Sequence, residues 1–257
     1  FMAFLRRDVI EKPPYDQLAA LYDYVMRHVD YVEWADYIEQ LFRWCGANPH
    51  KITEAACGTG ALALILADRG YSVSGYDLSE AMISVAKAKA RAGGENLPQF
   101  AVADMKSLPH GEADVVLCVY DSINYCSNTG ELAVTFRSFR KAVRAGGIAI
   151  FDVTTEANSL RYFRDYRYRE RHDGYMISRH SVYHPETRTQ TNEFVFEGPD
   201  LPGRVKEMHR QQIFSLKEVL ESIPAFEWSV LGAFDGYTLD PPDDDTERIH
   251  IVMRALG

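Results

Sequence analysis

The sequence predicts an α/β fold with a doubly wound, mostly parallel sheet, and three observations predict it. After Pro49, short apolar runs suited to buried strands alternate with helical patterns. A glycine-rich turn separates the first of these runs from the first helix, and two further strand-like runs end the chain. Strands that alternate with crossover helices pair in parallel and carry helices on both faces of their sheet.

The expected core covers residues 49–158. Its strands are predicted at residues 51–56, 71–77, 98–104, 113–120 and 146–153, and its helices begin at Gly60, Ser79 and about Thr129. Ligands in such sheets bind beyond the carboxyl ends of the strands. The loops that follow these strands are therefore the first place to look for a site.

Three further segments surround this core. Residues 1–48 are expected to form a helical cap, because residues 16–28 and 33–45 carry apolar side chains at helical spacing. Residues 159–213 are expected to form an inserted lobe of four antiparallel strands, since polar and apolar residues alternate there. Residues 214–257 supply a capped helix and two last strands, which are predicted to return to the core sheet.

The composition is that of an ordinary globular protein, with 46% hydrophobic and 25% charged residues. No apolar run approaches the ~20 residues that a bilayer span requires, and the first 15 residues lack the order of a secretory signal. Four cysteines stand far apart without metal-like pairing, which is typical of reduced thiols. We therefore expect a cytoplasmic protein with no membrane partner and no metal.

A net charge of −9 argues against a general affinity for nucleic acid. Residues 161–180 differ from the rest, because six arginines alternate there with tyrosines. Such a segment can hold an anionic or aromatic substrate. The same arginines can also lie on the solvent face of antiparallel strands, and the sequence leaves both interpretations open.

The glycine turn admits two cofactors. Gly58, Gly60 and Ala63 satisfy the loose dinucleotide pattern and Asp77 can bind a ribose, so a nicotinamide or flavin enzyme is one interpretation. A carboxylate at Glu54, ahead of the turn, would repel a pyrophosphate but would attract an ammonium group. The turn "CGTG" and the segments "GYDLSEAM" (75–82) and "ADM" (103–105) accompany it. Together they favour S-adenosylmethionine.

In these motifs the chain resembles the class I S-adenosylmethionine-dependent methyltransferases, over residues 50–153. The resemblance implies a Rossmann-like sheet of seven strands with the last one antiparallel. It also implies that Glu54 organises the site of the methionine ammonium, Asp77 accepts the ribose hydroxyls and Asp104 accepts the adenine amino group. The cofactor-binding residues expected in full are Tyr15, Tyr22, Glu54, Cys57, Gly58, Thr59, Gly60, Asp77, Leu78, Met82, Asp104, Met105 and Cys118.

Residues outside the core extend the resemblance. The segments 15–34, 206–219 and 246–254 are similar to a subgroup of small bacterial methyltransferases, mostly of unassigned substrate. That subgroup in turn resembles enzymes that dimethylate amino sugars attached to nucleotides and, more distantly, the glycine N-methyltransferases. By this likeness Tyr15 and Tyr22 fold over the cofactor and Trp34 packs the cap.

The acceptor site is expected in the loop after the fourth strand, "CVYDSINYC" at residues 118–126. Its predicted substrate-binding residues are Tyr120, Asp121, Ser122, Asn124 and Tyr125. The predicted catalytic residues are Tyr22, Asp121 and His209, the last as a proton acceptor because imidazole titrates near neutrality. Asp121 and Ser122 can instead cap the following turn, and His209 can be a buried sheet residue.

The predicted function is methyl transfer from S-adenosylmethionine to N or O of a small polar metabolite. The alternatives are a tRNA or protein methyltransferase, a protein that binds the cofactor without turnover, and an NAD-dependent oxidoreductase. Because a small acceptor is recognised by pocket shape and a few polar groups, the sequence identifies neither the acceptor nor the oligomeric state.

Overall fold

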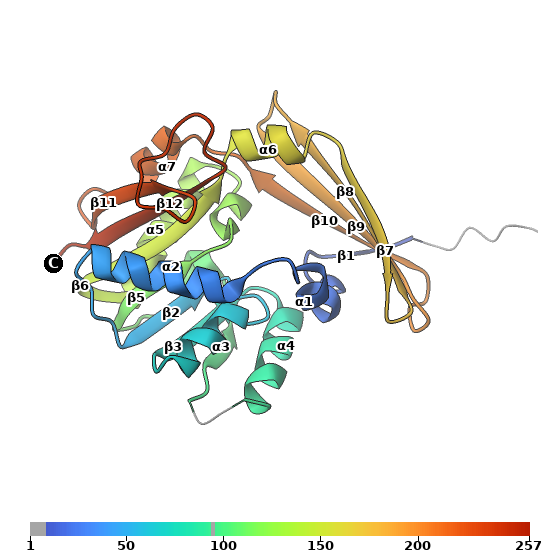
Figure 1. Ribbon diagram of the computed structural model, residues 1–257, viewed down its shortest axis with the longest axis horizontal. Coiled ribbons are helices and arrows are strands. Elements are labelled where there is room, and N and C mark those ends of the chain that lie inside the picture. The colour runs from blue at the N-terminus through green and yellow to red at the C-terminus, as the bar shows by residue number, and fades with distance from the viewer. Residues whose placement is uncertain (1–8, 94–95) are drawn as a thin grey trace, which may run out of the picture.

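The computed structural model describes residues 9–93 and 96–257, and it contains two sheets that lie at opposite ends of the molecule (Figure 1). The part of the expected cap in residues 1–8 lies outside the described residues. The larger sheet has seven strands and the smaller one has five. The short helix α1 (Tyr22–Val25) and helix α6 (Glu156–Tyr162) lie between them.

The seven-stranded sheet confirms the predicted fold class. Its strand order is β11-β12-β6-β5-β2-β3-β4, and β12 is antiparallel to both of its neighbours while the other pairs are parallel. The strands are β2 (Lys51–Ala55), β3 (Ser72–Asp77), β4 (Gln99–Val102), β5 (Ala113–Cys118), β6 (Val143–Thr154), β11 (Trp228–Asp235) and β12 (Arg248–Ala255).

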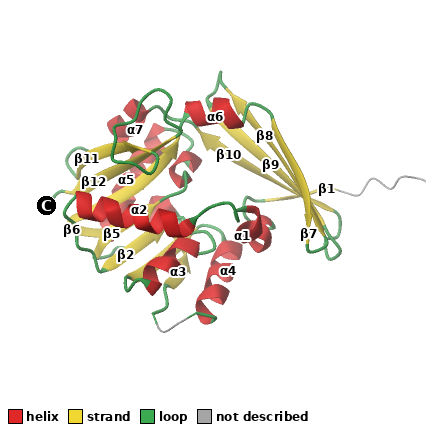
Figure 2. Cartoon of the chain, viewed as in Figure 1, coloured by secondary structure: helices red, strands yellow, loops and turns green. Residues whose placement is uncertain are grey.

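Helices cover both faces of this sheet (Figure 2). One apolar cluster joins the sheet to α2 (Tyr31–Trp44), α3 (Ala61–Asp68) and α4 (Glu80–Arg91). The other joins it to α5 (Thr129–Ala142) and α7 (Leu216–Ser222). Helix starts follow local capping chemistry: Ser79 caps α4 and Ser215 caps α7, each accepting a backbone N–H with its side chain. Their positions fix where the preceding loops end.

The predicted helix over residues 16–28 is shorter in the structure. It consists of a 3-10 turn at Leu18–Leu21 and a single helical turn, α1 (Tyr22–Val25). The carboxylate of Glu207 accepts the backbone N–H groups of Gln17 and Leu18, so the chain at the start of the 3-10 turn is bonded to the lobe. Tyr15, with a φ of 63°, turns the chain sharply just before this point.

The smaller sheet contains the four predicted antiparallel strands and one that the sequence analysis missed. Its order is β1-β10-β9-β8-β7, and β1 pairs in parallel with β10. The strands are β1 (Val9–Lys12), β7 (Tyr166–His172), β8 (Tyr175–His184), β9 (Thr189–Glu197) and β10 (Arg204–Gln212). Helix α6 (Glu156–Tyr162), also not predicted, leads from β6 to β7.

The expected cap is divided between the two sheets. β1 belongs to the lobe sheet, whereas α2 packs on the core sheet through side chains such as Trp34 and Ile38. The amphipathic pattern of α2 is satisfied by the core, because six of its residues are buried there. Only the short segment between β1 and α2 is left to cover the space between the sheets.

The lobe sheet has two chemically different faces. Register places Arg179 of β8, Asn192 and Phe194 of β9 and His209 of β10 on one face, which is turned towards the core. Side chains at the intervening positions, such as Arg167 and Arg169 of β7, lie on the solvent face and are exposed. The first of these faces is called the inner face below.

Candidate active site

One cavity of about 780 Å³ lies between the carboxyl ends of the core strands and the inner face of the lobe sheet. Sixteen of the nineteen predicted site residues line it. These are Tyr15, Tyr22, Glu54, Cys57, Gly58, Thr59, Asp77, Leu78, Met82, Asp104, Met105, Tyr120, Asp121, Ser122, Tyr125 and His209.

The glycine turn after β2 forms the floor of the cofactor end. Gly58 and Gly60 have φ angles of 54° and 73°, which glycine adopts without steric cost. A side chain at Gly60 would begin 2.5 Å from the ring of Phe100, so no larger residue fits. Gly60 itself does not line the cavity, because its backbone is turned towards this ring. Its contribution is to shape the turn.

Asp77, at the end of β3, closes this turn on one side. Its two carboxylate oxygens accept the backbone N–H of Gly58 at 2.9 Å and of Ser79 at 2.8 Å. Burial raises the pKa of Asp77, and the two N–H groups act in the opposite direction. Each oxygen keeps further lone-pair capacity, which suits the paired hydroxyls of a ribose.

Glu54 is the clearest sign that a cationic group belongs here. Its side chain is 3% exposed, and one carboxylate oxygen has no hydrogen-bond partner among the described residues. Burial, followed by the nearby charge of Asp77, raises the pKa of Glu54 to about 8. A buried carboxylate without a partner is costly unless a cation or donor satisfies it. The ammonium group of S-adenosylmethionine fits this position.

Thr59 binds the N-terminal segment to the turn. Its hydroxyl donates to Asp23 at 2.6 Å, and Asp23 also pairs with Lys89 of α4 at 2.8 Å. These contacts hold α1 over the glycine turn, where the ring of Tyr22 lies 4.0 Å from the position of a Cβ on Gly58. Tyr22 thus covers the cofactor end of the cavity.

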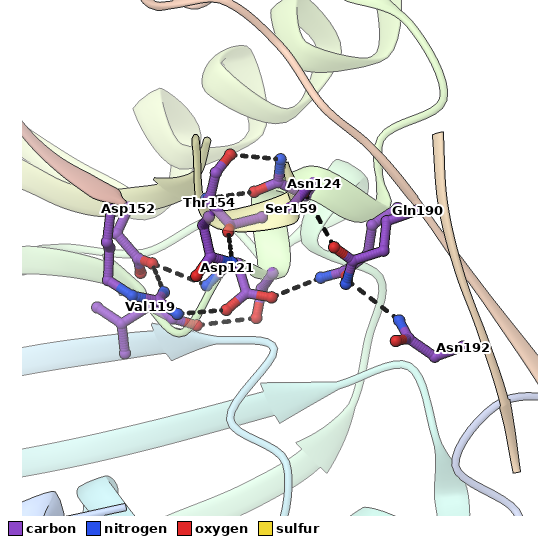
Figure 3. Close-up of polar contacts among 12 residues, drawn as sticks. Val119, Asp121, Asn124, Asp152, Thr154, Ser159, Gln190 and Asn192 are labelled. Atoms are coloured by element: carbon purple, nitrogen blue, oxygen red, sulfur yellow. Dashed lines mark hydrogen bonds and ion pairs between the residues drawn. The ribbon is translucent and has the colours of Figure 1, made fainter. Parts of the chain in front are cut away.

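Two further predicted residues do not line the cavity. Cys118 is fully buried and packs in the apolar cluster that faces α5, because it points to the opposite side of the sheet from the cavity. The Asn124 amide accepts the Thr154 backbone N–H at 3.0 Å (Figure 3). It also donates to the Gln212 carbonyl at 2.8 Å. Asn124 therefore joins the loop after β5 to β6 and to the lobe.

The predicted adenine contacts differ in exposure. Met82 is buried, whereas Leu78 is 69% exposed at the rim of the cavity. Asp104 caps the 3-10 turn Met105–Ser107 by accepting the N–H of Lys106 at 2.8 Å. The interpretation of Asp104 as a turn residue and its interpretation as an adenine acceptor are compatible, because one of its oxygens is left free by this bond.

Asp121 occupies the acceptor end together with two residues that the sequence analysis missed. Arg248 of β12 donates to one oxygen of Asp121 at 2.8 Å and also pairs with Asp152, and Gln211 of β10 donates to the other oxygen of Asp121 at 2.5 Å. The backbone N–H of Asp121 donates to Asp152 at 2.9 Å (Figure 3). Both oxygens of Asp121 are engaged, so its carboxylate is held in place between the core and the lobe.

This cluster is held by unusual backbone and aromatic contacts. Tyr120 and Asp121 have φ angles of 62° and 52°, a left-handed conformation that non-glycine residues rarely adopt. The Arg248 guanidinium lies 5.0 Å from the ring centre of Tyr120 and 5.5 Å from that of Trp34. Burial raises the pKa of both Asp121 and Asp152, and the positive charge of Arg248 lowers it.

His209 is part of a chain of four polar side chains. Its Nδ1 lies 3.1 Å from the hydroxyl of Tyr125, which lies 2.5 Å from the hydroxyl of Tyr15. Its Nε2 lies 3.3 Å from the carboxylate of Glu207. Glu207 is fully buried and also accepts the backbone N–H groups of Tyr15 and Leu18, both at 3.0 Å.

One tautomer of His209 gives each contact of this chain a donor and an acceptor. Burial raises the pKa of Tyr15 and of Tyr125, so both phenols remain protonated near neutral pH. With Nε2–H donating to Glu207, Nδ1 accepts the proton of Tyr125. Glu207 thus lies beside the imidazole of His209, and Tyr125 contacts its other ring nitrogen.

The residues that sequence reasoning missed lie on the inner face of the lobe. They are Arg179, Gln190, Asn192, Glu207 and Gln211, together with Arg248 of the core. A signal for part of this set was present: the residues at 207, 209 and 211 are polar at every second position, as are those at 190 and 192. Polar residues such as Thr191 and Arg210 stand between them, so the sequence alone does not separate the two faces of these strands.

The arginine-rich segment at 161–180 is divided by the strand pattern. Arg179 lines the cavity, whereas the other five arginines are exposed. Among residues 9–93 and 96–257, no group of three or more His, Cys, Asp or Glu residues is arranged to hold a metal ion. No helix in the part of the chain that the structure describes is long and apolar enough to cross a membrane.

Known proteins share both the sequence pattern and the fold. Residues 52–147 match the family model described as methyltransferase domain. YqeM of Bacillus subtilis (strain 168), provisionally named a methyltransferase, is 28% identical over 240 residues, which are 91% of this chain and 94% of that protein.

Two solved structures have the same fold. An S-adenosylmethionine-dependent methyltransferase from Clostridium acetobutylicum ATCC 824 superposes with a TM-score of 0.79 at 24% identity, over 95% of this chain and 99% of that one. CalS10 from Micromonospora echinaspora, an amino pentose methyltransferase solved with S-adenosylmethionine bound, superposes with a TM-score of 0.67 at 18% identity, over 91% and 95%.

The site and the comparisons lead to the same cofactor. The unpartnered oxygen of Glu54 suits an ammonium group and disfavours a pyrophosphate, so the dinucleotide interpretation is set aside. The matched domain and the full-length relatives confirm the resemblance noted in the sequence and the enzymatic class. The chain therefore contains a methyltransferase domain at residues 52–147 and resembles the class I S-adenosylmethionine-dependent methyltransferases along most of its length.

Proposed function

We propose that the protein transfers a methyl group from S-adenosylmethionine to an amine nitrogen, or to a hydroxyl oxygen, of a small polar metabolite. The single observation that carries the proposal is the shape of the cavity. The lobe sheet closes the side opposite the glycine turn, so the acceptor must fit within about 780 Å³ beside the cofactor. The amides of Gln190, Asn192 and Gln211 line that side and suit a polar acceptor.

The site residues would bind the cofactor at its charged groups. Glu54 would hold the ammonium, Asp77 the ribose hydroxyls, and the 104–106 turn the adenine edge. When bound, the cofactor supplies an electrophilic methyl group for an in-line displacement. The residues of the chain then act mainly by positioning the acceptor and excluding water. Tyr15 and Tyr22, which close the cavity from the N-terminal segment, would serve the second purpose.

His209 would remove the proton that an amine or hydroxyl acceptor must lose. The proton would pass to its Nδ1 through the hydroxyl of Tyr125, and Glu207 would stabilise the imidazolium. The amine is preferred as acceptor because the fold neighbour CalS10 is an amino pentose methyltransferase and the rat glycine N-methyltransferase is 26% identical over 117 residues. Asp121 would position this machinery through Gln211, which lies beside His209 on β10.

A tRNA or protein methyltransferase is the second candidate, favoured by the exposed arginines between 161 and 171. Acidic partners interrupt this surface: Arg167 pairs with Asp165, and Arg161 pairs with Glu247. A continuous basic face, which nucleic acid binding usually requires, is therefore not supported.

A single assay separates these functions. The purified protein is incubated with S-adenosylmethionine and, in parallel, with a panel of small amines, a panel of small hydroxyl compounds, bulk tRNA and a protein extract. Release of S-adenosylhomocysteine and the mass gain of one methyl group are measured. Methylation confined to small molecules supports the proposal, and methylation confined to tRNA or protein contradicts it.

A further inference from the structure

Arg179 is a cation on the inner face of the lobe without an acidic partner. Its Nε donates to the hydroxyl of Ser181 at 2.8 Å, and its Nη2 donates to the side-chain oxygen of Asn192 at 2.9 Å. Both partners are neutral, and Arg179 forms no ion pair with any residue that the structure describes. The guanidinium nevertheless lines the acceptor end of the cavity.

The surroundings of Arg179 withhold water from its charge. The guanidinium carbon lies 5.2 Å from the ring centre of Phe163, 5.4 Å from that of Phe194 and 5.7 Å from that of Tyr166. Burial lowers the pKa of Arg179, although an arginine side chain keeps its charge. A charge removed from water without a counter-ion is costly. Such a charge is expected where a ligand brings the missing anion.

The acidic groups near Arg179 on the cavity side are already committed. Asp121 uses both oxygens for Arg248 and Gln211. Glu207 accepts three backbone N–H groups of residues 15–18 and contacts His209. Neither carboxylate can turn towards Arg179 without breaking these bonds.

The orientation of the guanidinium is fixed in advance by a row of amides. Gln211 accepts from Asn192 at 3.4 Å and from Gln190 at 3.3 Å, and Gln190 in turn accepts from Ser159 at 3.0 Å (Figure 3). Because the Asn192 nitrogen donates to Gln211, its oxygen is left for Arg179. Two of the five N–H donors of the guanidinium are used in this way, and three remain for a ligand.

We propose that Arg179 binds an anionic group of the methyl acceptor, a carboxylate or a phosphate, so that the substrate class is an amine or hydroxyl compound carrying such a group. This inference rests on the proposed function in taking the ligand to be the methyl acceptor. Binding of the anion to Arg179 does not itself depend on methyl transfer. The three free donors match the oxygens of either anion, since a guanidinium binds both through parallel hydrogen bonds.

The first test measures anion binding without an acceptor. The melting temperature of the protein saturated with S-adenosylhomocysteine is followed while acetate or inorganic phosphate replaces chloride at constant ionic strength. The wild type is compared with Arg179→Met and with Arg167→Met, a matched control on the solvent face. We expect a saturable rise for the wild type and the control and none for Arg179→Met.

Comparing the two anion arms distinguishes a carboxylate from a phosphate site. An equal rise in all three proteins, or no saturable rise in the wild type, overturns the proposal. This anion-binding test gives a result even if no compound of the acceptor panel is methylated. In that case the proposed function fails, and the anion site is judged by its own test.

The second test uses acceptors found by the panel, taken as matched sets of three: a neutral amine, its carboxylate analogue and its phosphate analogue. For the anionic members, Arg179→Met should raise KM by about 10- to 100-fold through loss of charge-assisted hydrogen bonds. The neutral member should change little. Equal KM values of the wild type for neutral and anionic members would contradict the inference while leaving the proposed function intact.

Discussion

The two ends of the cavity are built in different ways. The cofactor end is formed mainly by residues 54–59, 77–82 and 104–106, which follow consecutive parallel strands of the core. The acceptor end collects residues from the loop after β5, from β8, β9, β10 and from β12. The difference teaches that a short motif can specify a shared cofactor, whereas the acceptor site depends on side chains that only the complete fold brings together.

The largest effect is expected from a substitution at the acceptor end alone. His209→Gln should lower kcat by about 10²- to 10⁴-fold, the usual contribution of a positioned proton acceptor. The dissociation constant for S-adenosylmethionine should remain unchanged, because His209 lies on the lobe. Steady-state kinetics and calorimetric titration measure the two quantities. The exposed His184, changed to Gln, serves as control, and a parallel loss of cofactor binding would argue against the division into two ends.

The next largest effect is expected from replacing Arg248, which links the core to the acceptor end. Arg248→Met leaves the buried carboxylate of Asp152 and the partly buried one of Asp121 without their cation, and should lower the free energy of unfolding by roughly 3–5 kcal/mol. Urea unfolding measures the change. Arg144→Met, at the half-exposed pair with Asp114, should cost about 1 kcal/mol or less.

The stability of Arg248→Met should also depend on pH. Burial already raises the pKa of Asp121 and Asp152 in the folded state, and loss of Arg248 raises it further. The folded state then binds more protons than the unfolded state above pH ~4, so stability falls as pH rises. As the pH is lowered from 7 to 5, we therefore expect the free energy of unfolding of Arg248→Met to rise relative to that of the wild type. If the difference in the free energy of unfolding between the two proteins is constant across this range, the carboxylates are compensated by another group in the variant.

A third change breaks the cofactor end. Asp77→Ala should weaken S-adenosylmethionine binding by roughly 1.5–3 kcal/mol, because charge-assisted hydrogen bonds to the ribose are lost. Since Asp77 also accepts the N–H groups of Gly58 and Ser79, Asp77→Asn is the matched variant that retains one acceptor oxygen. Calorimetric titration measures both. Unchanged affinity in Asp77→Ala would remove the ribose assignment.

The smallest effect sharpens the role of Glu54. Its pKa of about 8 in the free protein means that it is mainly protonated at pH 7. An ammonium group favours the carboxylate, so binding S-adenosylmethionine should release a proton and its affinity should rise from pH 6 towards pH 8. Calorimetry in buffers of different ionisation enthalpy counts this proton. Glu54→Gln should abolish the release, and a release that persists in this variant would assign it to another group.

The sequence was sufficient for the core because local chemistry decides it. The alternation of strands and helices, the glycines of the turn and the N-cap at Ser79 each act over a few residues, so the order and the carboxyl-end placement of the motif residues could be predicted. Thirteen of the sixteen predicted site residues that line the cavity lie in this core, whereas Tyr15, Tyr22 and His209 come from the cap and the lobe. Cys118 was misplaced by one step of strand alternation, which moved it to the opposite face of the sheet.

The remainder depends on tertiary contacts that no local pattern encodes. The helix predicted from Asp16 begins later, because Glu207 accepts N–H groups of residues 15–18 and holds this segment against the lobe. Arg248 stands at the start of a mostly apolar strand with no local sign of a site, yet it pairs with Asp152 of β6 and with Asp121 of the loop after β5. Arg179 could not be separated from five exposed arginines before the register of β7 to β10 was known.

The pairing of β1 with β10 has a consequence for the order in which the protein becomes functional during synthesis. Tyr15 and its carboxylate partner Glu207 are 192 positions apart in the chain. Contacts of such sequence separation form late, because closing the long intervening loop costs entropy before the contact contributes any stabilising free energy. A nascent chain would therefore complete its glycine turn early and remain open above it. We expect the pocket to close over its cofactor only after β10 has left the ribosome, so the enzyme acquires a sealed reaction chamber as one of its last folding events.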